Sequence, residues 1–157
     1  MTPAAEIVEA ITIAHLEQVR LLFREYQSGL PADCRFTDTE WQNVPGRYAP
    51  PGGTLLLATV RGEAAGCVGL RSFPLPGTCE MKRLYVKPEC RGLGLGRELV
   101  TAIVGRARHL GYQKVRLDTL PESMVAAVSL YRQLGFVALP QRDLVGTSGL
   151  LDMELHL

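Results

Sequence analysis

The chain has 157 residues, of which 46% are hydrophobic and 21% are charged, a balance typical of one globular domain. Its 17 lysines and arginines nearly cancel its 16 aspartates and glutamates, which excludes the strong overall field that favours nucleic acid or an anionic membrane surface. We therefore expect a single domain over residues 1–157, with neither nucleic acid nor a membrane as its partner.

The N-terminal residues lack the basic start and long apolar run of a secretory signal, and no apolar run approaches the ~20 residues that span a bilayer. A cytoplasmic location is the expectation. The four cysteines contain no C-x-x-C pair, which argues against a zinc ribbon or a dithiol motif and favours reduced thiols. Because the three histidines are isolated, we expect no metal site.

The first third of the chain begins regularly and then becomes irregular. Apolar residues within 7–13 predict a strand, and helical spacing over 16–26 predicts a helix. Prolines and glycines then interrupt residues 28–53, where a short helix is expected from about 37 to 41. We expect this irregular stretch to form a mobile wall that faces the substrate.

Strands and helices fill the rest of the chain, separated by short turns. A hairpin turn is expected at residues 61–63, between the first two strands of this part. The full expectation is strands over residues 55–60, 65–71, 79–86, 114–119, 136–139 and 150–157, and helices over residues 95–110 and 123–134. This order predicts a mixed α/β sheet with helices on its faces.

A glycine-rich turn joins the strand over 79–86 to the helix that follows. It reads Val86-Lys87-Pro88-Glu89-Cys90-Arg91-Gly92-Leu93-Gly94-Leu95-Gly96-Arg97. Alternate glycines let the backbone point its amides inward and let a ligand approach without meeting a Cβ. The helix start adds unpaired N–H groups and the positive end of its dipole, and the two arginines add cationic donors. Together these features predict a diphosphate site.

Other interpretations of the turn are a plain strand-to-helix connection and two nucleotide sites. A Rossmann site is the sharper rival, because Asp118 ends a strand some twenty residues on, where a ribose-binding acid is expected. However, the third glycine of G-x-G-x-x-G would fall at Arg97 or Leu99 and is missing. A P-loop is excluded because no Gly-Lys-Ser/Thr follows.

The segment Arg91–Gly96 resembles the cofactor motif Arg/Gln-x-x-Gly-x-Gly/Ala of the GCN5-related N-acetyltransferase (GNAT) family. Residues 80–86 resemble the central strand of that family, and Ala127–Phe136 is similar to its A-x-x-L-Y-x-x-x-G-F ending. The resemblance implies the GNAT fold, an α/β (α+β) architecture. Its central sheet is mixed but mostly antiparallel, with splayed fourth and fifth strands and helices on both faces.

Acetyl-CoA as cosubstrate, without a metal, is also what the resemblance implies. The pantetheine arm is expected in the gap between the splayed strands, paired to main-chain groups of the central strand. The cofactor-binding residues carried over are Leu84, Tyr85, Val86, Arg91, Gly92, Leu93, Gly94, Leu95, Gly96 and Arg97. Many relatives bind the arm with an asparagine where this chain has Met124, and Ser123 is the candidate substitute. The final strands of this fold often pair across a homodimer.

The implied chemistry is direct attack of an amine on the thioester. A lysine-like amine has a pKa of ~10.4, so about one in a thousand is neutral at pH 7, a handicap of roughly 4 kcal/mol. Glu80 is the candidate base, with a solvated carboxylate or a partner of Lys82 as the alternative. Tyr131 is the candidate acid for the departing thiolate, with a packed core aromatic as the alternative. A main-chain N–H near Val86 is expected to stabilise the oxyanion.

The acceptor is expected to be a small-molecule or peptide amine that the sequence does not identify. Residues of the irregular segment either line its pocket or serve ordinary packing; they are Asp33, Arg35, Trp41 and Tyr48. Cys90 beside Arg91 has the setting of a low-pKa thiol, but no base accompanies it. The alternative function is a non-catalytic module that senses acyl-CoA.

Overall fold

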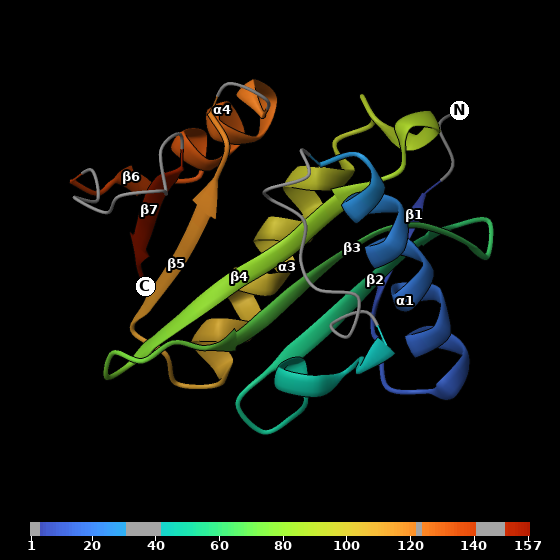
Figure 1. Cartoon of the computed structure of the whole chain (residues 1–157), viewed down its shortest axis with the longest axis horizontal. Coiled ribbons are helices and arrows are strands. Elements are labelled where there is room, and N and C mark those ends of the chain that lie inside the picture. Colours follow the sequence, from blue (N-terminus) through green and yellow to red (C-terminus); the bar gives the residue numbers. More distant parts are fainter. Residues whose placement is uncertain (1–3, 31–41, 122–123, 141–149) are drawn as a thin grey trace.

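The computed structural model describes residues 4–30, 42–121, 124–140 and 150–157. These residues form one seven-stranded sheet in the order β1-β2-β3-β4-β5-β7-β6 (Figure 1). The strands are β1 (Ala5–Glu9), β2 (Thr54–Val60), β3 (Glu63–Ser72), β4 (Thr78–Val86), β5 (Lys114–Thr119), β6 (Val137–Ala138) and β7 (Leu151–His156). The helices of the described residues are α1 (Ile13–Ser28), α3 (Leu95–His109) and α4 (Val125–Gln133), with 3-10 turns η2 (Gly46–Tyr48) and η3 (Pro88–Cys90).

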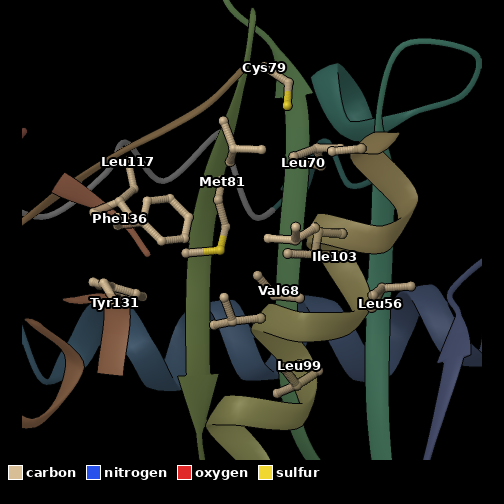
Figure 2. Packing of buried hydrophobic residues seen from close by; sticks show 14 of the residues in the cluster. Leu56, Val68, Leu70, Cys79, Met81, Leu99, Ile103, Leu117, Tyr131 and Phe136 are labelled. Carbon is tan, nitrogen blue, oxygen red and sulfur yellow. The ribbon is translucent and has the colours of Figure 1, made fainter. Parts of the chain in front are cut away.

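Helices α1 and α3 cover opposite faces of the sheet (Figure 1). Alternate residues of a strand point to opposite faces, so Leu57 of β2 packs with α1 while Leu56 packs with α3. Leu99 and Ile103 of α3 are fully buried against the face of the sheet that α3 covers (Figure 2). Burial of each such side chain contributes about 1.5–3 kcal/mol. The sheet is thus fixed from both sides.

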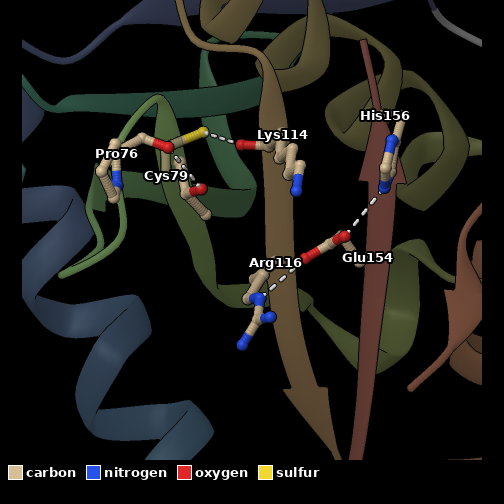
Figure 3. Close-up of polar contacts among 7 residues, drawn as sticks. Pro76, Cys79, Lys114, Arg116, Glu154 and His156 are labelled. Atoms are coloured by element: carbon tan, nitrogen blue, oxygen red, sulfur yellow. Dashed lines mark hydrogen bonds and ion pairs between the residues drawn. The ribbon is translucent and has the colours of Figure 1, made fainter.

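Strands β4 and β5 are parallel and pair over only three positions, from Thr78↔Lys114 to Glu80↔Arg116. Across this short pairing, the buried thiol of Cys79 donates to the carbonyl oxygen of Lys114 at 3.4 Å (Figure 3). Burial raises the pKa of Cys79 to about 12, so the thiol remains a donor. Beyond Glu80 the two strands diverge, and β5 alone runs toward α4 (Figure 1). The predicted splay and the predicted mixed sheet are confirmed.

The first strand is shorter than predicted. It ends at Glu9 because Thr12 caps α1, its side-chain oxygen accepting from the amide of His15 at 3.1 Å. Ile11 and Ile13, taken as strand residues from their apolar character, are 65% and 89% exposed. A local capping contact therefore ended the strand before the apolar pattern did.

Other elements differ from expectation only at their ends. The hairpin between β2 and β3 needs two residues, Arg61 and Gly62, which both have positive φ (53° and 79°) as a type I′ turn requires. The strand predicted over 136–139 is limited to Val137–Ala138. The short helix predicted over 37–41 lies outside the described residues. No helix within the described ranges has the length and apolar character to cross a membrane.

Candidate functional site

A cavity of about 970 Å³ opens where β4 and β5 separate. Its walls come from the second half of β4, the glycine turn, the end of β5 and one side of α4. On the face of the sheet that α1 covers, the cavity is lined by Tyr26, Gly29 and Leu30, at and just after the end of α1. The predicted cofactor segment and the predicted acid therefore line one continuous space.

The glycine turn holds its backbone open toward this cavity. Gly92 and Gly94 have φ values of +82° and +79°, which are left-handed conformations that a side chain strains. Among the described residues, the amides from Gly92 to Arg97 donate to no protein atom, and the first helical bond runs from the amide of Glu98 to Gly94 at 3.1 Å. We call these amides the amide nest. Convergent free N–H groups at a helix start fit an anionic phosphate.

Arg91 lines the cavity, but its main-chain amide and its side chain are both bonded within the protein. Its amide donates to the carbonyl oxygen of Pro88 at 3.3 Å, so the nest begins one residue later, at Gly92. Its Nε donates to the carbonyl oxygen of Val86 at 2.9 Å, and its guanidinium lies 5.8 Å from the ring centroid of Tyr85. In this structure the arginine braces the end of β4.

Arg97, the second flanking arginine, is bonded to another helix. Its guanidinium donates to Oε1 of Gln133 on α4, and Gln133 in turn donates to Ser129 at 3.3 Å. The start of α3 and the last turn of α4 are therefore tied together beside the cavity. Leu95 and Gly96 line the cavity at the start of α3, whereas the side chain of Leu93 is exposed and Leu93 is not among the described residues that line it.

Beyond Glu80, the edge of β4 that faces the gap has no strand partner among the described residues, although the carbonyl oxygen of Val86 accepts from Nε of Arg91. The amide of Lys87 donates toward β3, to the carbonyl oxygen of Ala65 at 2.9 Å. Because successive residues of a strand point their main-chain groups to opposite edges, Leu84 and Val86 direct theirs to the gap. A bulge at Arg83, whose φ is +61°, sets this register. The pantetheine contacts of Leu84 and Val86 stay a prediction.

Tyr85 differs from its neighbours because its side chain reaches α1. Its hydroxyl donates to Oε2 of Glu25 at 2.8 Å, and its ring meets that of Tyr26 edge-on at 5.6 Å. Burial, followed by the bond to Glu25, raises the pKa of Tyr85 to about 12. The residue therefore joins the end of α1 to the cofactor strand.

Tyr131 is buried on α4, with 6% of its surface exposed, and lines the cavity. Its ring packs at 5.8 Å from that of Phe136, across Met81 from the α3 side chains (Figure 2). Burial raises the pKa of Tyr131 well above its ordinary value, and Tyr26 and Asp118 raise it further. The phenol is therefore protonated throughout the neutral range.

Glu80 lies at the last paired position of β4 and is 9% exposed. Its Oε1 accepts a hydrogen bond from Nε of Arg71 at 3.0 Å, and Nη2 of Arg71 lies 3.0 Å from the same oxygen as an ion pair. The suggested partner Lys82 is wrong: Lys82 pairs instead with Asp118, at 3.1 Å. Glu80 itself is not among the described residues that line the cavity.

Outside the cavity, a charged side chain of β5 contacts a carboxylate of β7. Arg116 of β5 donates to Glu154 at 2.8 Å, and His156 lies 2.8 Å from the other carboxylate oxygen of Glu154 (Figure 3). Burial alone raises the pKa of Glu154, but the bonds from Arg116 and His156 outweigh it and hold that pKa below its ordinary value. Among the described residues no cluster of three metal-ligating side chains occurs.

Some sequence candidates fall elsewhere. Tyr48 is buried under Gly53 and Gly69 and packs with Phe23, so it does not line the cavity. The other candidates, Asp33, Arg35, Trp41 and Ser123, lie outside the described residues. Sequence reasoning missed the lining residues Tyr26 and Leu30, whose only signal was their place at the end of an amphipathic helix. It also missed the contact of Lys82 with Asp118, which depends on strand register.

A free amide nest that opens into a gap between splayed parallel strands fits a class of proteins that bind a diphosphate together with an extended arm. The chain belongs to the Acetyltransferase (GNAT) family, whose sequence profile matches residues 16–136. It is an acetyl-CoA-dependent N-acetyltransferase, as the resemblance implied. The Rossmann interpretation of Asp118 is therefore wrong, because that carboxylate lines the acyltransferase cavity.

Individual relatives agree with this assignment. An uncharacterized N-acetyltransferase of Schizosaccharomyces pombe is 41% identical over 140 residues, covering 87% of this chain and 85% of that protein. The uncharacterized N-acetyltransferase YjgM of Escherichia coli is 26% identical over 165 residues, covering 100% and 96%. The structure of yncA from Salmonella typhimurium with its cofactor acetyl-CoA superposes with a TM-score of 0.78 at 23% identity, covering 98% and 94%, and so shows the same fold.

Proposed function

We propose that the enzyme transfers the acetyl group of acetyl-CoA to a primary amine by direct attack on the thioester, with Tyr131 as the acid. The observation that carries this proposal is the single cavity that joins the amide nest to Tyr131 through the gap beside β4. A carrier held by its diphosphate at one end of this space has its thioester at the other.

The residues present fit acetyl-CoA. The nest from Gly92 to Arg97 supplies free amides, and an added Cβ at Gly92 or Gly94 would meet no protein atom within 4 Å, so the space above them is open. Leu84 and Val86 offer strand-like main-chain groups to the amides of the arm. Val86 does so only if the Arg91 side chain releases its carbonyl oxygen.

In the proposed reaction the neutral amine nitrogen forms a bond to the thioester carbon, and the carbon–sulfur bond then breaks. The departing thiolate takes the phenolic proton of Tyr131, the product nitrogen gives up one proton to water, and the Tyr131 phenolate then regains a proton from water. The raised pKa of Tyr131 keeps this proton in place until the thiolate forms. The same apolar surroundings raise the proton affinity of the thiolate, so the transfer stays nearly balanced.

Glu80 remains our proposed base, acting through a water molecule. It stands at the base of the gap, and Arg71 occupies only Oε1, so among the described residues Oε2 accepts no protein donor. Lys-like acceptors are almost wholly protonated at pH 7, so a nearby carboxylate lowers the cost of reaching the neutral amine.

Incubation with acetyl-CoA and a panel of primary amines, followed by thiol release, tests the function. Turnover on at least one amine, together with coenzyme A binding by calorimetry, is the expected result. Tight binding without turnover on any amine would instead support the acyl-CoA sensor, and absence of binding would overturn both.

A further inference from the structure

One ion pair spans the gap between the splayed strands. Backbone pairing of β4 with β5 stops at Glu80↔Arg116. Two residues further along each strand, Nζ of Lys82 meets Oδ1 of Asp118 at 3.1 Å. Both residues line the cavity, and both side chains are largely buried, with 15% and 24% exposed. The strands are thus rejoined by charge where their hydrogen bonds end.

The pair lies on the face of the sheet opposite α3. On β5, Leu117 is buried in the α3 core, so the neighbouring Asp118 points to the other face. On β4, Lys82 pairs in register with Gly69, whose added Cβ would meet the ring of Tyr48 on the α1 side. Tyr131, by contrast, belongs to the α3 side of the sheet. An acceptor entering from the α1 side therefore meets the pair before it reaches the thioester.

A pair of opposite charges selects an acceptor that also carries both charges. A simple cationic amine that approaches Asp118 must either displace Lys82 or lie beside its like charge, which costs free energy in a partly buried site. A zwitterion replaces the one ion pair by two, one to each of its own charged groups. The charges of both side chains then stay compensated.

We propose that the acceptor is a free α-amino acid, an inference that rests on the proposed function. Its ammonium group binds Asp118 and its carboxylate binds Lys82. The ammonium and carboxylate groups of an α-amino acid are separated by one carbon atom, so one molecule can reach both side chains, which lie 3.1 Å apart in the pair. Loss of the ammonium proton at the bound amine then yields the nucleophile described above.

The first test compares the turnover of paired acceptors by the wild-type enzyme. Each free amino acid of a panel is compared with its own carboxamide, which keeps the side chain and the amine but lacks the carboxylate. The amine of the carboxamide is the more often neutral of the two, so chemistry alone favours it. We expect kcat/KM for the best free amino acid to exceed that of its carboxamide by at least tenfold. Equal or faster turnover of the carboxamide overturns the inference while leaving the proposed function intact.

Lys82→Met gives the second test. It should raise KM for the amino acid at least tenfold and abolish the preference over the carboxamide. Lys114→Met is the matched control, because it removes a cation of β5 outside the cavity lining and should keep the preference. Coenzyme A binding by calorimetry shows that each variant is folded. A Lys82→Met enzyme that binds coenzyme A and retains the preference overturns the inference.

Discussion

Arg71 on β3 aims both Nε and Nη2 at one oxygen of Glu80 on β4, each at 3.0 Å. The two residues are register partners in adjacent antiparallel strands, so the contact is built into the sheet. The guanidinium also lies 5.8 Å from the ring centroid of Tyr48. Glu80 is thereby held in one place, as a proton acceptor acting through water must be.

Glu80→Gln should lower kcat about 10²-fold at neutral pH, because the amine proton loses its acceptor. The deficit should shrink as pH approaches 10, where free amine is abundant without help. Rate profiles from pH 6 to 10 measure this. A loss of kcat that is constant from pH 6 to 10 contradicts the assignment of Glu80 as base. A lowered melting temperature with full activity would mean that the Arg71–Glu80 pair contributes to stability alone.

Tyr131→Phe should lower kcat about 10²-fold and leave coenzyme A affinity unchanged. The phenyl ring keeps its packing with Phe136, so the melting temperature should shift by less than in a cavity-forming variant. Because burial raises the pKa of Tyr131, the wild-type rate should show no fall up to about pH 10 from loss of this proton. An unchanged kcat in Tyr131→Phe would remove the residue from the mechanism.

Gly94→Ala tests the amide nest. The methyl group meets no protein atom, but φ of +79° strains any residue with a Cβ by about 1–2 kcal/mol, so the turn should distort and coenzyme A affinity should fall. Gly105→Ala is the control: it lies inside α3, where alanine should stabilise by about 1 kcal/mol without changing affinity. Calorimetry on both variants compares them. Equal affinities would show that the nest does not grip the diphosphate.

The strength of sequence reasoning differed between local and long-range features. The glycine turn was predictable because the spacing Gly92, Gly94 and Gly96 determines the backbone conformation of that segment by itself. The apolar patterns predicted the strands themselves, and a capping contact at Thr12 explains why the first strand ends earlier than they indicated.

Side-chain partners across strands could not be predicted. Lys82 meets Asp118, and Glu80 meets Arg71, only because β4 lies between β3 and β5 in a particular register. The bulge at Arg83 shifts that register within β4, and nothing in the local sequence announces it. Chemistry that depends on two strands therefore needed the structure.

Glu154→Gln should destabilise the protein at pH 7 by about 1–3 kcal/mol, because charged bonds from Arg116 and His156 are weakened. The folded state lowers the pKa of Glu154, so the carboxylate contributes stability that is complete above the unfolded pKa of ~4.3 and is lost as pH falls through the folded value. The difference between wild type and Glu154→Gln in urea should therefore shrink below about pH 4. Glu63→Gln, at the exposed first position of β3, is the control and should leave the stability at pH 7 close to that of the wild type. A difference that grows on acidification would mean that the folded state raises this pKa instead.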